Sequence, residues 1–272
     1  AEPEIHPEHF DNLIWYAGRA DMVGLLYPYY YSKMAYDGFK SMGRDDIITL
    51  TRCAYLGSQK FGSLVWSGDI ESTFESLACQ VKAGLNMSMC GIPWWNTDIG
   101  GFYGADITSD YFKELIVRWF QFGLFSPVMR LHGSRIRHFE ATPGLLEPSG
   151  DPNEIWSFGE RNFEILKNLI FIREKLRPYI QKQMNIASEQ GYPVMRPMFF
   201  EYPDDEKCYK SDSQYMFGDD IIFAPIVEQG QTKKSVYIPD GEWILTKDKK
   251  IYTKGTYEIT AEIDEFIAFV KK

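Results

Sequence analysis

Leu64-Val65-Trp66-Ser67-Gly68-Asp69-Ile70 is a short apolar run that ends abruptly in a glycine and a carboxylate. Leu64 to Trp66 suit a buried strand, and Gly68 lets the backbone turn or a ligand approach closely. Asp69 would then stand at the carboxyl end of that strand. The alternative is that Asp69 only caps a following helix, which is the commoner role of a lone aspartate in front of a helix.

The same arrangement repeats along the first half of the chain. Strand-like apolar runs cover residues 47–51, 64–66, 87–92 and 126–129. Helical patterns cover residues 25–42, 72–85, 110–122 and 158–189. This alternation is typical of parallel βαβ units, with helices packed outside a parallel sheet. Four such strands are half of a (β/α)8 barrel.

Polar side chains follow each of these runs. They are Arg52, Asp69, Asp98, Arg130 and His132. In a (β/α) barrel the carboxyl ends of the strands form the active-site face, so we expect these side chains to meet there as an exposed lip. Two carboxylates, two guanidiniums and an imidazole suit a polyhydroxylated ligand. Trp66, Trp94, Trp95 and Phe102 could stack on its apolar face, or could simply belong to the core, as large aromatic residues usually do.

The pattern changes at about residue 192. Short apolar strands separated by turn residues cover residues 198–200, 215–217, 221–224, 235–238, 243–245 and 266–269. Such spacing is typical of an antiparallel sandwich. We therefore predict an α/β chain with part of a barrel at residues 1–191 and a small antiparallel β-sandwich domain at residues 192–272.

Composition narrows the class of protein. The chain has 272 residues, 44% of them hydrophobic, which is enough for a sizeable core. Its net charge of -9, without a basic stripe, argues against nucleic acid as a partner. An apolar stretch of 18 residues is missing, so we expect neither a membrane span nor a signal peptide. The four cysteines lack metal-like spacing and are interpreted as reduced core thiols, which suits a cytoplasmic protein.

The sequence also argues against a nucleotide site, a metal site and a glycan. Gly100 to Gly104 is glycine-rich but lacks the spacing of a nucleotide loop. His132 and His138 have no companion ligand at metal-like spacing, and a buried structural histidine is the better interpretation of the former. The sequon at Asn86 adjoins the predicted buried strand, where a glycan could not fit.

Nine segments carry a resemblance to a known family. They are Arg52, Gly57-Ser58-Gln59-Lys60, Trp66-Ser67-Gly68-Asp69, Gly91-Ile92-Pro93, Asp98-Ile99-Gly100-Gly101-Phe102, Arg118-Trp119-Phe120-Gln121-Phe122-Gly123, Arg130-Leu131-His132-Gly133, Arg196-Pro197-Met198-Phe199 and Ala224-Pro225. Each alone is weak, but their combination and order are specific. The chain resembles glycoside hydrolase family 31, the retaining α-glucosidases and α-xylosidases, over nearly its whole length.

The resemblance implies a role for each candidate residue. Asp69 would be the general acid/base. The residues that would bind or line the subsite of the cleaved sugar are Arg52, Trp66, Asp98, Phe102, Arg130 and His132. The substrate would be an α-glucoside or α-xyloside oligosaccharide, cleaved without metal or organic cofactor. Two carboxyls about 5 to 5.5 Å apart would allow double displacement with retention.

One element of the family pattern is absent. The family nucleophile is an aspartate that ends the fourth barrel strand within Asp-x-x-Glu, and Glu2 matches the glutamate of that motif. The nucleophile is therefore expected upstream of residue 1, and the chain is expected to be strands 5–8 of the barrel with the following sandwich. Alone it should be inactive. Its open strand edges should pair with the missing N-terminal half or with another copy. The alternative is a noncatalytic carbohydrate-binding or scaffold protein that kept the pocket.

Overall fold

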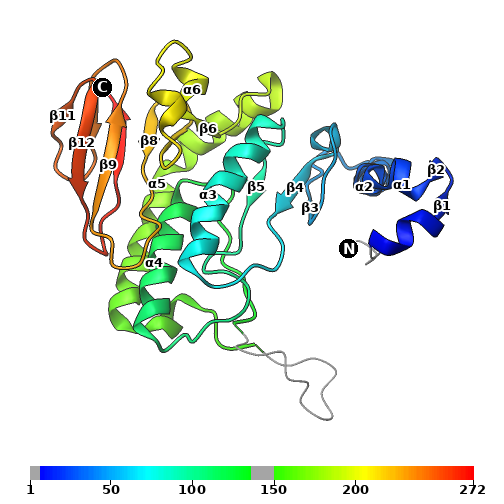
Figure 1. Cartoon of the computed structure of the whole chain (residues 1–272), viewed down its shortest axis with the longest axis horizontal. Helices are drawn as coiled ribbons and strands as arrows, with labels where there is room; N and C mark the ends of the chain where they lie inside the picture. Colours follow the sequence, from blue (N-terminus) through cyan, green and yellow to red (C-terminus); the bar gives the residue numbers. More distant parts are fainter. Residues whose placement is uncertain (1–6, 136–149) are drawn as a thin grey trace.

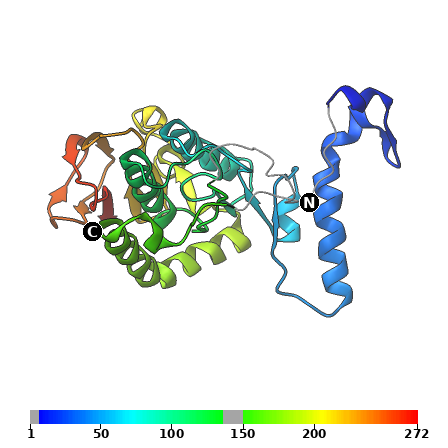
Figure 2. The same ribbon diagram turned by 90° about the horizontal axis from the view of Figure 1, so that it is seen from below.

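The computed structural model describes residues 7–135 and 150–272 (Figure 1). Small elements open the chain: η1 (Pro7–Asn12), β1 (Ile14–Trp15), β2 (Gly18–Arg19), α1 (Ala20–Val23) and η2 (Gly24–Leu26). Helix α2 (Tyr27–Ser41) follows and confirms the helix predicted over residues 25–42. Gly43, at a φ of 76°, lies just past its end. Figure 2 shows α2 standing to one side of the body of the protein.

The centre of the first half is a three-stranded parallel sheet in the order β3-β4-β5. The strands are β3 (Thr49–Thr51), β4 (Ser63–Trp66) and β5 (Trp95–Asn96), with the short helix η3 (Ser58–Phe61) before β4. Along β4, Ser63 and Val65 are buried while Leu64 and Trp66 are only half-buried. Because side chains alternate between the faces of a strand, one face of this sheet is covered and the other is open. The open face corresponds to a barrel interior.

Two of the four strands predicted in the first half of the chain are wrong. Residues 87–92 do not form a strand, because α3 (Phe74–Met89) continues through good helix formers and places Asn86 in an exposed position on the helix. The strand lies further on, at β5. Residues 126–129 are not a strand either, since Pro127 has no N–H to donate. A backbone bond from the Ile99 N–H to the Arg130 carbonyl joins the end of that segment to the residues after β5.

Long helices pack on the β5 side of the parallel sheet and on one another. They are α3, α4 (Asp110–Leu124) and α5 (Glu160–Gln190), with η4 (Ile155–Phe158) before α5. Side-chain oxygens of Thr73 and Ser109 cap α3 and α4 by accepting bonds from the backbone N–H groups three residues on. From Leu115 to Leu124 every residue of α4 is buried, so this helix is the centre of the larger core.

The C-terminal region contains two antiparallel sheets. Its elements are β6 (Met195–Pro197), α6 (Met198–Glu201), η5 (Cys208–Lys210), β7 (Tyr215–Phe217), β8 (Ile221–Phe223), β9 (Lys233–Ile238), β10 (Trp243–Leu245), β11 (Ile251–Tyr252), β12 (Gly255–Thr260) and β13 (Ala268–Lys271). The larger sheet has the order β11-β10-β13-β8-β7-β6, and β12 pairs with β9. Residues 198–200 were predicted as a strand and instead form helix α6, whose Tyr202 N–H bonds the Met198 carbonyl.

The middle strands of the larger sheet, β7 and β8, are buried on both faces. Tyr215, Phe217 and Phe223 belong to the core shared with the long helices, whereas Met216 and Ile222 belong to the core shared with β9 and β12. The fold is therefore α/β: part of a (β/α)8 barrel followed by a β-sandwich domain. The division at residues 191 and 192 stays a prediction.

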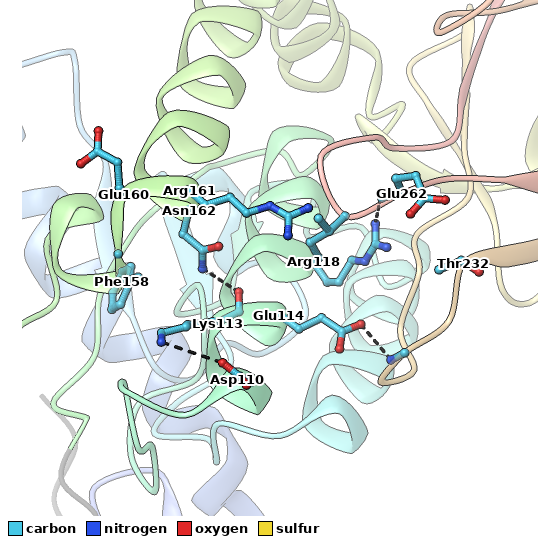
Figure 3. A pocket seen from close by; sticks show the side chains of 13 residues that line it. Asp110, Lys113, Glu114, Arg118, Phe158, Glu160, Arg161, Asn162, Thr232 and Glu262 are labelled. Carbon is cyan, nitrogen blue, oxygen red and sulfur yellow. Dashed lines mark hydrogen bonds and ion pairs between the residues drawn. The ribbon is translucent and has the colours of Figure 1, made fainter.

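Arg118 joins the two parts. It is 2% exposed, and its guanidinium donates to the carbonyls of Glu262 and Glu265 at 3.2 and 3.1 Å. The Gln121 amide donates to the carbonyls of Ile263 and Glu265 at 2.8 and 3.0 Å. This contact lies in the wall of a cavity of about 480 Å³ that contains none of the candidate site residues (Figure 3). The motif at residues 118–123 thus holds the sandwich on the barrel helices.

We expect Arg118→Met to lower the free energy of unfolding by about 3 kcal/mol or more, because it leaves several buried carbonyls without a donor. Arg177→Met is the control, since Arg177 makes only an exposed ion pair with Glu174. That variant should change stability by less than about 0.5 kcal/mol. Urea unfolding measures both, and equal effects would contradict the role of Arg118.

Candidate active site

Backbone hydrogen bonds hold together the segments that follow β4 and β5. The Phe102 N–H donates to the Ile70 carbonyl at 2.7 Å, and the Ser72 N–H donates to the Tyr103 carbonyl at 2.9 Å. The Ser67 hydroxyl also donates to the Thr97 hydroxyl at 3.1 Å. The segments that carry Asp69 and Asp98 are therefore fixed relative to each other by main-chain contacts.

Gly101 allows this close approach. Its φ is 79°, and a Cβ at this position would lie 2.6 Å from the Ser72 Cα. Only glycine adopts such a conformation readily and leaves room for a neighbouring backbone. The glycines of the 100–104 segment therefore serve the packing of two site segments, in agreement with their lack of a nucleotide-loop pattern.

Asp69 and Arg52 form the outer pair of the site. Their side chains are each 43% exposed, and the Arg52 guanidinium donates to an Asp69 carboxylate oxygen at 2.8 Å. The guanidinium also lies over the Trp66 ring, 5.6 Å from its centroid. Asp69 thus stands at the end of β4 with an accessible carboxyl, as a group that exchanges a proton with a ligand must.

Asp98 and Arg130 form the inner pair, and here the prediction of an exposed lip is wrong. The Asp98 side chain is 0% exposed and is bonded by the Arg130 guanidinium, which is 25% exposed. Burial raises the pKa of the Asp98 carboxyl, the charges of Arg130 and His132 lower it, and the negative charge of Asp69 raises it again. Asp98 follows β5, whose two residues are buried as well.

His132 and Phe102 lie side by side. Their ring centroids are 5.7 Å apart and the ring planes are inclined at 34°. His132 is exposed and Phe102 is half-buried, so the interpretation of His132 as a satisfied buried histidine is wrong. The pair offers a ligand one apolar ring and one polar ring.

Several buried polar atoms at this site have no hydrogen-bond partner among the described residues. They include Asp98 Oδ2, Arg130 Nε and both amide atoms of Asn96. Asn96 was not predicted from the sequence. The available signal was its position, because residues two apart on a strand share a face and Asn96 is two residues before Asp98. These atoms offer acceptors and donors of the kind that sugar hydroxyl groups need.

Arg135 is the second residue that sequence reasoning missed. It is fully buried and follows the predicted Arg130-Leu131-His132-Gly133 segment by two residues. Its guanidinium donates to the Ile99 carbonyl at 2.6 Å and to the Gly101 carbonyl. The structure thus connects the His132 segment with the turn that follows Asp98.

The remaining predictions concern cysteines, metals and membranes. None of the four cysteines forms a disulfide, but only Cys208 is buried, while Cys79 and Cys90 are exposed, so the assignment of all four to the core is wrong. No group of three metal-ligating side chains occurs within residues 7–135 and 150–272, and His138 lies outside them. Over the same residues, none of the helices has the length and apolar character needed to cross a membrane. The cytoplasmic location stays a prediction.

Comparisons with known proteins give one family. Residues 5–183 match the model of the glycosyl hydrolases family 31 TIM-barrel domain, and residues 191–272 match the family 31 C-terminal domain. An alpha-xylosidase of Saccharolobus solfataricus is 35% identical over 217 residues, which are 80% of this chain and 28% of that protein. An isomaltosyltransferase of Sporosarcina globispora is 36% identical over 250 residues, or 90% of this chain and 22% of that protein.

Solved structures agree. A family 31 alpha-xylosidase from a soil metagenome, complexed with xylose, superposes with a TM-score of 0.93 and 42% identity over 100% of this chain and 41% of its own. A dextranase of Flavobacterium johnsoniae superposes with a TM-score of 0.88 and 30% identity, over 99% of this chain and 32% of its own. The chain thus spans less than half the length of these relatives. With both family models matched in order along it, the chain belongs to glycoside hydrolase family 31.

Proposed function

We propose that this chain supplies the acid/base half of a retaining α-glycosidase that removes terminal α-linked glucose or xylose. The observation that carries the proposal is the pair of carboxylates that follow adjacent parallel strands, one accessible and one buried. Family membership supports a glycosidase. The names of the relatives, which include xylosidases and glucosidases, support the two sugars.

The two carboxylates have different tasks. Asp69 is accessible and donates a proton to the leaving oxygen as the glycosidic bond breaks, then takes a proton from the water that completes hydrolysis. Asp98 is held by Arg130 at the base of the site, so it accepts hydrogen bonds from sugar hydroxyl groups. Arg52, Arg130 and His132 supply donors, while Trp66 and Phe102 supply the ring faces.

We assign the nucleophile to the complementary half of the barrel. Asp98 is not the nucleophile in this proposal, because one of its carboxylate oxygens is bonded by the Arg130 guanidinium and the other is assigned to the sugar hydroxyl groups. Both edge strands of the three-stranded parallel sheet lack an outer neighbour among the described residues. Exposed apolar side chains near the N-terminal elements include Ile14, Met22, Leu25, Met34, Met42 and Ile48. A complementary barrel half would cover these side chains and supply the missing carboxylate.

We expect Asp69→Asn in the full-length enzyme to slow hydrolysis about 10²- to 10⁴-fold for poor leaving groups and far less for activated phenols. The reason is that an alkoxide needs a proton to depart and a stabilised phenolate does not. Steady-state kinetics on a series of aryl and alkyl α-glycosides measures how the loss of rate depends on the leaving group. An equal loss across the series would refute the acid role of Asp69.

The 272-residue chain alone should not hydrolyse aryl α-glucosides or α-xylosides, because in this proposal the group that forms the glycosyl-enzyme intermediate lies on the complementary barrel half. Mixing it with the complementary barrel half should restore turnover. Size-exclusion chromatography with the assay would show whether the halves associate. Turnover by the chain alone would mean that a nucleophile within it has been overlooked. Sugar binding by the full-length protein without turnover would favour the noncatalytic alternative.

Asp98→Asn should lower kcat/KM about 10- to 150-fold, because a charged hydrogen bond to a sugar hydroxyl contributes about 1.5 to 3 kcal/mol. Deoxy substrates provide the control. For a substrate that lacks the contacted hydroxyl, kcat/KM should fall much less when Asp98 is changed, since the interaction with that hydroxyl is already absent. If every deoxy substrate loses as much as the parent glycoside, Asp98 has a structural role only.

A further inference from the structure

The Arg135 guanidinium donates hydrogen bonds to three segments of the chain. Arg135 donates to the carbonyls of Ile99 and Gly101 in the turn after Asp98, and at 3.4 Å to the His132 carbonyl. Its Nε and one terminal nitrogen donate to Asn153 Oδ1 at 2.9 and 2.8 Å. The guanidinium also lies over the Phe112 ring at 5.3 Å from the centroid.

Glycines make room for this side chain. A Cβ at Gly100 would lie 2.9 Å from an Arg135 terminal nitrogen, and one at Gly133 would lie 2.7 Å from its Cζ. Arg135 itself has a φ of 60°, which is unusual for a residue with a side chain. Strain of this kind persists where surrounding contacts determine the conformation, and here the contacts are those of the guanidinium.

Within residues 7–135 and 150–272, no carboxylate is bonded to the Arg135 guanidinium. All of its described acceptors are backbone carbonyls and the Asn153 amide oxygen. Burial lowers the pKa of Arg135 to about 10, so the group is still a cation at neutral pH. Its charge also lowers the pKa of Asp98. The site therefore contains a buried cation that acts on Asp98 through space.

We propose that Arg135 is a positioning residue for the sugar subsite, which fixes the turn carrying Asp98 and Phe102 against the segment carrying His132. The inference rests on the proposed function. A guanidinium is suited to this task because its planar fork directs several N–H groups at fixed angles, which a lysine ammonium cannot do. A small displacement of these contacts would weaken binding of the sugar and of the transition state.

The test separates geometry from stability. In the full-length protein, Arg135→Lys keeps the charge and loses the fork, so KM for aryl α-xylosides and α-glucosides should rise about tenfold or more. Arg118→Lys is the matched control, because Arg118 is a buried arginine that also bonds distant carbonyls but lies at the sandwich junction. It should lower the melting temperature and leave KM within about twofold. An equal KM for both variants overturns the inference.

Asn153 provides a second pair of variants. Asn153→Ala removes two bonds of the guanidinium and should raise KM about threefold or more, whereas the isosteric Asn153→Asp keeps the acceptor and should leave KM nearly unchanged. This pair gives the result if Arg135→Lys does not fold. An unchanged KM in Asn153→Ala overturns the inference.

The pH profile gives a readout that a merely structural role would not move. Asp98 is faced by Arg130, His132, Asp69 and Arg135. Asn153→Asp adds a negative charge against Arg135, so Asp98 should ionise at higher pH and the acid limb of kcat/KM should move up by about 0.5 to 1 unit. Arg135→Lys keeps the charge and should leave the limb in place. Absence of a shift in Asn153→Asp contradicts the through-space action of Arg135.

Failure of the proposed function can be told apart from failure of this inference. If the unmodified full-length protein hydrolyses neither glycoside, the proposed function fails. Titration calorimetry with xylose and with glucose then measures the Kd of the same variants for the monosaccharide, without any need for turnover. Arg135→Lys should weaken binding of the monosaccharide about tenfold while Arg118→Lys does not, and equal Kd values for the two variants overturn the positioning role.

Discussion

Buried backbone carbonyls that have no partner in a helix or sheet must find a donor, and in this protein arginines supply it. Arg135 bonds the carbonyls of the turn after Asp98, and Arg118 bonds those of the loop before β13. Arg173 donates to the carbonyls of Leu124, Ser126 and Pro127 at 2.7 to 2.9 Å. A single guanidinium can donate to several carbonyls that come from different segments. The regular hydrogen bonds of a helix or a sheet cannot satisfy carbonyls scattered in this way. The irregular parts of the fold depend on these contacts.

Arginines also pair with the two carboxylates of the site. Asp69 and Asp98 each face one arginine, but the first pair is open to solvent and the second is enclosed. An enclosed pair is held in one geometry, whereas an accessible carboxyl can approach a ligand and exchange a proton. In the proposed function, the depth of each carboxylate therefore separates a binding role from a chemical role, although the residue types are the same.

The sandwich domain packs on the barrel helices. The middle strands of its larger sheet, β7 and β8, are buried on both faces, against the long helices on one side and against β9 and β12 on the other. Helix α4 connects the two regions, since Arg118 contacts the sandwich and Phe112 lies beneath Arg135. The barrel helices that hold the site segments are thus enclosed by a second core.

The sequence by itself determined the class of fold, the long helices, most of the sandwich strands and the candidate residues from Arg52 to His132, because these depend on local periodicity and on residue type. It misplaced the strand at residues 87–92, where helix-forming residues outweighed an apolar pattern that either element could show. Only the tertiary structure decided which side chains are buried. It enclosed Asp98, exposed His132 and brought Arg135 against carbonyls 34 and 36 residues away in the chain. Contacts of that kind join segments distant in sequence, so no local pattern could have indicated them.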